Sequence, residues 1–117
     1  MQQPVPKVTE SDVSRIVARD FSADEIARAH AILNDYGMES WEREIARVRV
    51  AALKLAAGSL EALRSHVKVA KSDYRDVLAA AEYPAYMSVA FRSHPPADGE
   101  MRISTDWEQY REWFERG

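Results

Sequence analysis

The stretch 40–57 constrains the fold most, because it carries apolar side chains on two sides of a single helix. At a period of about 3.6 residues, one face holds Trp41, Ile45, Val48, Ala52 and Leu55, and a second holds Ala46, Val50, Leu53 and Ala57. A helix that is apolar on two sides needs neighbours on both. We therefore predict an all-α fold, a single small bundle of five or six helices around this central buried helix.

The composition agrees with one soluble domain. The chain has 117 residues, 46% of them hydrophobic and 30% charged, which suits a single core. No apolar run approaches the roughly 20 residues that a membrane-spanning helix needs, and residues 1–9 lack the basic start and apolar stretch of a secretory signal. We expect one helical domain over 1–117 with a flexible leader over 1–9, a cytoplasmic location and no membrane partner.

Capping and turn residues predict two helices before the central one. A short peripheral helix is expected around Ile16, where apolar residues first recur at helical spacing. Ser22 followed by Glu25 forms a capping box, in which both side chains satisfy free backbone N–H groups at a helix start. The second helix therefore begins near Ala23, and Gly37 supplies its left-handed stop.

Two more helices follow the central one after short connections. Gly58 ends the central helix and Ser59 can cap the next, whose buried stripe is formed by Leu60, Leu63, Val67 and Ala70. Ser72 can cap a fifth helix, which Pro84 ends. Connections this short place consecutive helices antiparallel.

The segment after the fifth helix fits two structures. Residues 85–103 form either a helical turn followed by a loop or an extended strand, the latter suggested by the alternation of Met87, Val89 and Phe91. We favour the helical turn, and we predict a loop over 92–104 from its prolines and glycine.

A second capping box, Thr105 with Glu108, predicts the start of the last helix. This helix carries four aromatic residues within one arc, namely Trp107, Tyr110, Trp113 and Phe114. Such a face either covers the core of its own chain or docks into a second subunit, because aromatic residues dominate binding hot spots. We favour the first and keep a homodimer interface as the alternative.

Charge is distributed unevenly along the chain. The net charge is −3, yet residues 41–75 contain eight basic and four acidic residues, while the segments on either side are acidic. Arg64, Lys68 and Lys71 share one exposed helical strip, which raises the question of nucleic acid. We expect no nucleic-acid partner, because the pI is near 5.6 and no aromatic residue interleaves with this strip.

Three segments, ALKLAAGSLEALRSHVKVAK, DYRDVLAAAEYP and DWEQYREWFER, resemble a group of small uncharacterised bacterial proteins of similar length. The resemblance spans roughly the last two thirds of the chain. It implies an all-helical fold, and it implies no activity, substrate or partner.

The predicted topology brings one group of polar residues together. If the third, fourth and fifth helices run up, down and up, the starts of the third and fifth lie at one end. That end gathers Glu39, Trp41, Glu42, Arg43 and Glu44 beside Asp73, Tyr74, Arg75 and Asp76. Such carboxylates act as general bases or bind hard cations, and arginines orient anionic partners. The alternative is a network of salt bridges and helix caps, which most helical bundles carry.

The sequence predicts neither a metal nor a cofactor. There is no cysteine, and none of the three histidines, His30, His66 and His94, follows a glutamate at the Glu-x-x-His spacing of di-iron bundles. His66 lies at the margin of an apolar stripe, where a hydrogen-bonded boundary histidine is more frequent than a catalytic base.

The sequence alone does not fix a function. The interpretation we favour is a small helical protein-interaction or accessory module, whose partner is another protein or a second copy of the chain. The alternative is an enzyme that uses Glu42, Asp73 or Asp76 as acid or base, with Tyr74 and Arg75 positioning the substrate. A helical nucleic-acid binder is the weaker alternative.

Overall fold

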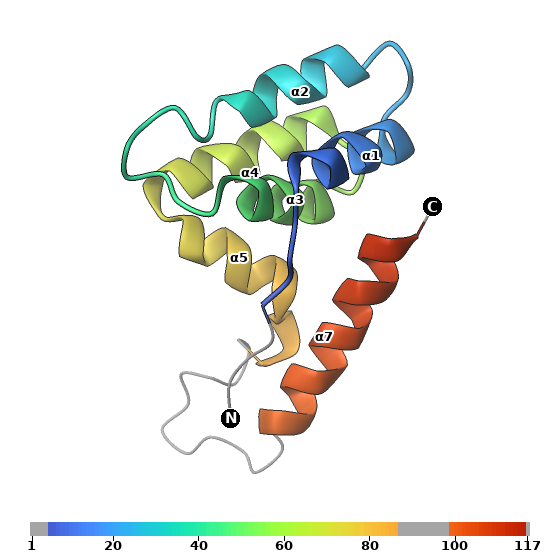
Figure 1. Ribbon diagram of the computed structural model, residues 1–117, viewed down its shortest axis with the longest axis vertical. Coiled ribbons are helices and arrows are strands. Elements are labelled where there is room, and N and C mark those ends of the chain that lie inside the picture. The colour runs from blue at the N-terminus through green and yellow to red at the C-terminus, as the bar shows by residue number, and fades with distance from the viewer. Residues whose placement is uncertain (1–4, 87–98, 117) are drawn as a thin grey trace.

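The computed structural model describes residues 5–86 and 99–116, and every regular element in those ranges is helical. The helices are α1 (Glu10–Asp20), α2 (Ile26–Asn34), α3 (Ile45–Ala56), α4 (Leu60–Ser72), α5 (Tyr74–Glu82) and α7 (Gly99–Glu115) (Figure 1). A helical turn at residues 84–86 follows α5. The prediction of an all-α bundle is confirmed.

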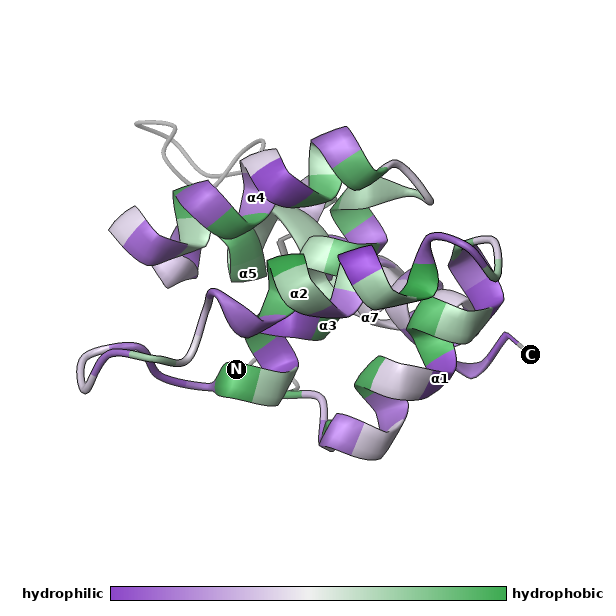
Figure 2. Ribbon diagram, turned by 90° about the horizontal axis from the view of Figure 1, so that it is seen from above, coloured by the Kyte–Doolittle hydropathy of each residue, from purple (hydrophilic) through white to green (hydrophobic). Residues whose placement is uncertain are grey.

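Helix α3 occupies the centre of the bundle. It packs against α1, α4 and α5, and its side chains Val50 and Leu53, which belong to the second apolar face, have no exposed surface. Each surrounding helix carries both hydrophobic and hydrophilic residues, as is typical of amphipathic helices that pack around a shared core (Figure 2). The prediction of a buried central helix is therefore confirmed.

The start of the central helix was predicted too early. Helix α3 begins at Ile45 and not near residue 40, and Trp41 lies in the preceding turn with 64% of its surface exposed. Glu44 has a left-handed backbone with φ of 55°, which breaks the helical path just before Ile45. The apolar pattern could not reveal this break, because it continues through residues that the backbone turns away from the core.

The predicted cap of the second helix is also wrong. Helix α2 begins at Ile26 and has no side-chain cap. The Ser22 hydroxyl donates to the carboxylates of Asp24 at 2.6 Å and Glu25 at 3.0 Å and does not accept a helix N–H. A true capping box is found instead at the start of α1. The Asp12 N–H donates to the Thr9 hydroxyl oxygen, and the Thr9 N–H donates to the Asp12 carboxylate. Aspartate replaces the usual glutamate or glutamine at that third position.

The junction between α3 and α4 follows the prediction. Ala57 and Gly58 have φ of 50° and 83°, and a Cβ on Gly58 would lie 3.0 Å from the Asp20 carbonyl oxygen, so glycine is needed there. Ser59 caps α4 by accepting the Ala62 N–H. At the next junction Asp73, and not Ser72 as predicted, caps α5.

The two ends of the chain differ from the sequence-based expectation. Within the predicted leader, Pro6 is buried and Val8 packs against the core, while Val5, Lys7 and Thr9 are exposed; the flexibility of the leader stays a prediction. Helix α7 begins at Gly99, which makes residues 99–104 helical where a loop was predicted. The predicted cap at Thr105 and Glu108 lies inside this helix. The remaining parts of those predictions, residues 1–4 and 87–98, lie outside the described residues.

Two buried residues in the first half of α7 hold this helix against the fold. Ile103 and Asp106 are both buried, and the Asp106 carboxylate accepts the backbone N–H groups of Ala85 at 3.1 Å and Tyr86 at 2.9 Å. This carboxylate thereby caps the helical turn at residues 84–86 from a distant part of the chain. Tertiary contacts through Ile103 and Asp106 thus hold α7 against the rest of the fold.

Two arginine side chains of α1 bind the far end of α7, which lies on the same side of the molecule as α1 (Figure 1). Arg15 donates to the Phe114 carbonyl at 2.7 Å, and Arg19 donates to the Trp113 carbonyl at 2.6 Å and the Arg116 carbonyl at 2.8 Å. Both guanidinium groups also lie over an aromatic ring of α7. The two arginines therefore cap the free carbonyls at the C-terminal end of α7.

Candidate functional site

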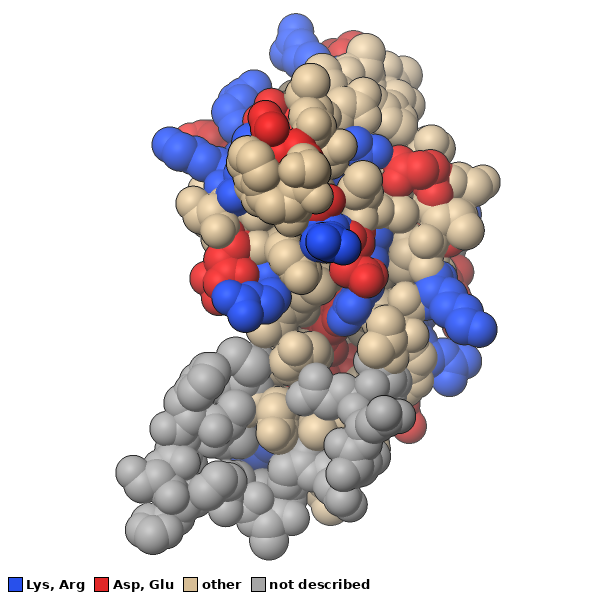
Figure 3. Space-filling view, turned by 60° about the vertical axis from the view of Figure 1, so that its left-hand side comes forward, with Lys and Arg blue, Asp and Glu red and all other residues tan. Residues whose placement is uncertain are grey.

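A pocket of about 290 Å³ lies between the segment before α3 and the junction of α4 with α5. We call it the Trp41 site, and its lining consists of Tyr36, Trp41, Glu42, Ala70, Lys71, Ser72, Asp73, Tyr74 and Arg75. Figure 3 brings forward the side of the molecule that carries residues 35–44 in Figure 1, and acidic and basic groups lie next to each other on this face.

Glu42 is the most strongly bound polar group of the Trp41 site. Its side chain is buried, and Oε1 accepts the backbone N–H groups of Gly37, Met38 and Glu39 at 2.8, 3.0 and 3.1 Å. The other oxygen, Oε2, pairs with Lys71 Nζ at 3.0 Å. Burial opposes ionisation, but these hydrogen bonds outweigh it and lower the pKa of Glu42 to about 2.

Two further contacts fix the segment 35–44, which we call the 35–44 loop. The buried Tyr36 hydroxyl donates to the Arg43 carbonyl at 2.6 Å, and Lys71 Nζ donates to the Asp35 carbonyl at 2.8 Å. Burial raises the pKa of Tyr36 to about 12, so the hydroxyl stays protonated as a donor. The loop is therefore held at both ends and in its middle.

The 35–44 loop presents two large apolar side chains to solvent. Trp41 is 64% exposed and Met38 is 75% exposed, although the backbone amide of Met38 is bonded to buried Glu42. The loop thus combines fixed backbone with uncovered apolar surface. Large exposed apolar groups on a rigid segment are a common feature of binding surfaces.

Polar pairs close the other side of the Trp41 site. Asp73 caps α5 by accepting the Arg75 N–H at 3.1 Å, and its two oxygens also receive the Arg75 guanidinium at 3.0 and 3.1 Å. The Arg75 side chain and its N–H lower the pKa of Asp73, and Asp73 in turn raises the pKa of Arg75. Tyr74 is half-buried and packs against the core. Both carboxylates of the pocket are therefore paired.

The structure brings together five of the residues that the sequence singled out, namely Trp41, Glu42, Asp73, Tyr74 and Arg75. Glu39 and Arg43 contribute backbone groups, an N–H and a carbonyl, and Asp76 lies exposed in the first turn of α5 away from the lining. Sequence reasoning missed Tyr36 and Lys71. Lys71 carried a signal, since it lies in the last turn of the helix that precedes Asp73, but it was assigned to the solvated strip of α4.

The aromatic residues of α7 cover the core of their own chain. Tyr110 is 1% exposed and its ring stacks on Trp107 and Phe114, with centroids 6.2 and 5.9 Å away. Trp107, Trp113 and Phe114 are partly buried against the core cluster. Of the arc predicted as a possible interface, Tyr110 is thus buried in its own chain and the other three rings partly so, and the homodimer interface stays a prediction.

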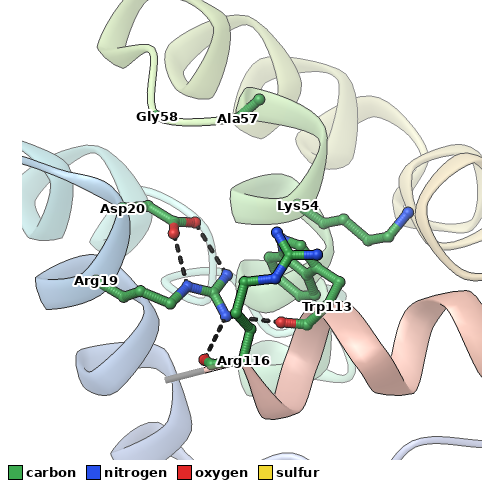
Figure 4. Close-up of a pocket in the computed structure, with 7 residues that line it drawn as sticks. All are labelled: Arg19, Asp20, Lys54, Ala57, Gly58, Trp113 and Arg116. Atoms are coloured by element: carbon green, nitrogen blue, oxygen red, sulfur yellow. Dashed lines mark hydrogen bonds and ion pairs between the residues drawn. The ribbon is translucent and has the colours of Figure 1, made fainter.

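A larger cavity, of about 600 Å³, lies where the C-terminal ends of α1, α3 and α7 meet (Figure 4). Its lining includes three basic residues, Arg19, Lys54 and Arg116, beside Asp20 and Trp113. Arg19 binds Asp20 and the last carbonyls of α7, and burial lowers the pKa of Lys54. Cations stabilise helix C-termini, so Arg19 compensates the partial negative charge at the end of α7.

The described residues contain neither a group of metal ligands nor a helix that could span a membrane. Within the described residues, no three His, Cys, Asp or Glu side chains come close enough to hold a metal ion. None of the helices in those ranges combines the length and apolar character needed to cross a membrane. Comparison of the chain with protein families, curated proteins and solved structures found no match.

Proposed function

We propose that the protein is a small protein-interaction module that binds an apolar segment of another protein at the Trp41 site. The observation that carries the proposal is the pairing of exposed Trp41 and Met38 with a loop backbone fixed by buried Glu42. The Trp41 side chain is not needed to order the loop, because polar contacts already fix the loop backbone.

Pre-organisation supports this proposal. Binding costs free energy when loops and side chains must be ordered, and a loop that is already fixed avoids part of that cost. Tryptophan is also among the residues that contribute most to interface energy. The pocket beside Trp41 contains the pairs Glu42 with Lys71 and Asp73 with Arg75, so its charges balance and favour an uncharged apolar segment.

The ionisation of the pocket supports a binding role over acid–base catalysis. A general acid and a general base need pKa values moved in opposite directions toward the working pH. In the Trp41 site the pKa of Glu42 and that of Asp73 are both lowered, and each carboxylate already has a cationic partner. Neither carboxylate is free to take up a proton near neutral pH.

The test uses a peptide library displayed on phage and selected against the full chain. We expect selected peptides rich in apolar residues, which lose at least about tenfold in affinity for Trp41→Ala and less for Met38→Ala. Val69→Ala is the matched control, because Val69 is also an exposed apolar residue but does not line the pocket. Circular dichroism of each variant checks that its fold is unchanged.

Two results would reject the proposal. Peptides that bind Trp41→Ala as tightly as the wild type would place the binding surface elsewhere. A concentration-dependent homodimer in sedimentation, lost in Trp41→Ala, would show that a second copy and not another protein covers this site.

A further inference from the structure

A second surface lies between α2 and α4, where a groove of about 540 Å³ opens along the two helices. Its floor is formed by Ala31 and Ile32 of α2 and Val67 of α4. Ala31 is exposed and Ile32 is only partly buried, so the groove presents apolar atoms to solvent. The small Ala31 side chain leaves the space open.

Basic residues flank the apolar floor on the α4 side. Arg64, Lys68 and Lys71 line the groove together with one acidic residue, Asp35. They follow one another at spacings of four and three along α4, so they form a strip of two turns, about 11 Å long. Lys71 is paired with Glu42 at the end of this strip.

The other two cations have no such partner. Neither Arg64 nor Lys68 forms an ion pair or a side-chain hydrogen bond with any residue in the described ranges. Like charges four residues apart destabilise a helix slightly. The strip therefore carries a small unfavourable repulsion on a chain whose net charge is −3.

We infer that the α2–α4 groove binds an acidic amphipathic helix of a partner protein. The apolar face of such a helix covers Ala31 and Ile32, and acidic residues on its flank pair with Arg64 and Lys68. Opposite charge speeds the encounter and sets the orientation of the partner. The groove and the Trp41 site share Lys71, but Trp41 does not line the groove, so Trp41→Ala tests the two surfaces separately.

The groove differs from a nucleic-acid site in its floor and in its charge. Polyanions are bound by accumulated positive charge, whereas here the cations lie along one edge of an apolar surface and Asp35 stands beside them. A partner must therefore offer apolar and acidic groups together, at helical spacing, over about two turns.

The test measures fluorescence anisotropy of a labelled peptide of roughly 14 residues, with leucines at i, i+3, i+4 and i+7 and glutamates on the flanking positions. We expect the peptide to bind the full chain, and its affinity to fall with added salt. Arg64→Glu/Lys68→Glu should weaken binding at least about tenfold. A peptide with lysines in place of the glutamates should not bind.

The matched control is Lys7→Glu/Arg111→Glu, which makes the same change in net charge on exposed residues that do not line the groove. It should leave the affinity within about twofold. Ile32→Ser adds a test of the apolar floor, and it should weaken binding while Trp41→Ala does not. The Trp41→Ala result also separates a failure here from a failure of the proposed function.

Three outcomes would overturn the inference. If a scrambled peptide of the same composition binds equally well, the binding rests on net charge and not on an amphipathic helix. An equal loss of affinity in the control variant would likewise show that net charge, and not the groove, determines binding. Binding of phosphatidylglycerol vesicles that requires Arg64 and Lys68, without binding of the acidic peptide, would assign the groove to a lipid surface.

Discussion

The 35–44 loop and helix α7 are both rich in apolar side chains, yet they use them in opposite ways. Trp41 of the loop is 64% exposed, whereas Tyr110 of α7 is 1% exposed and stacked between two rings. Helix α7 lies over the core, and its aromatic face replaces solvent there. The loop is fixed by polar contacts instead, so its aromatic side chain is free of the core.

Each region contains a buried carboxylate that accepts backbone N–H groups. Glu42 accepts three backbone N–H groups of the loop, and Asp106 of α7 accepts two from residues 85 and 86. Backbone N–H groups that lack a partner are costly away from water, so a carboxylate can order an irregular segment. Aromatic content alone therefore does not distinguish a core helix from an exposed loop.

The largest expected effect separates the two aromatic positions. Tyr110→Ala removes a fully buried ring, and we expect it to lower the free energy of unfolding by about 3–5 kcal/mol. Trp41→Ala removes an exposed side chain and should change that free energy by no more than about 0.5 kcal/mol. Urea denaturation followed by circular dichroism measures both. Similar losses in the two variants would contradict the contrast between core helix and loop.

The next effect concerns the carboxylate that fixes the loop. Glu42→Ala leaves three backbone N–H groups without their acceptor and the Lys71 ammonium without its carboxylate partner, and we expect a loss of about 2–4 kcal/mol in the free energy of unfolding. Glu39→Ala is the control, since Glu39 contributes only its backbone N–H and its side chain is exposed. A stable Glu42→Ala chain would mean that the loop is ordered by other contacts.

Acid should weaken the fold through the same group. The pKa of Glu42 is about 2 in the folded chain and near 4.5 in the unfolded chain, so protons bind the unfolded chain first. The contribution of Glu42 is complete above about pH 5 and is lost as the pH falls toward 2. Thermal denaturation at several pH values measures the slope. Glu42→Gln should flatten this slope, and an unchanged slope would assign the acid sensitivity to other carboxylates.

The smallest expected effect compares two buried tyrosine hydroxyls. The Tyr36 hydroxyl donates to the Arg43 carbonyl at 2.6 Å, and Tyr36→Phe should cost about 1 kcal/mol of unfolding free energy. The Tyr110 hydroxyl has no hydrogen-bond partner among the described residues, so Tyr110→Phe should be neutral or slightly stabilising. Denaturation of both variants provides the measurement. A larger cost at Tyr110 would point to an ordered water on its hydroxyl.

Sequence reasoning predicted the core better than the edges. The apolar pattern identified α3 as the central helix, because burial on two sides leaves a clear trace in side-chain type. It placed the start of that helix too early, because the break at Glu44 depends on a left-handed backbone that no residue type there requires. The start of α7 was also missed. Contacts that hold this helix, such as the hydrogen bonds of Asp106 with the backbone of residues 85 and 86, join residues about 20 positions apart.

The candidate site was predicted in outline. Helix order brought Trp41 and Glu42 to the start of α5, but the sequence gives no sign of which atoms a carboxylate will bind. Glu42 was considered as a general base, and its partners turned out to be the amides of its own loop. Hydrogen bonds between side chains and backbone depend on the local path of the chain, which hydrophobic periodicity does not encode.

The contacts of Arg15 and Arg19 with the last turn of α7 bear on the order of events during synthesis. These hydrogen bonds join residues 94 to 101 positions apart, while α3, α4 and α5 are neighbours in the sequence. On the ribosome α1 and the central helices can therefore pack before residues 113–116 have emerged, and only the carbonyl partners of Arg15 and Arg19 come last. Attachment of the final helix to the first is the step that completes the native protein.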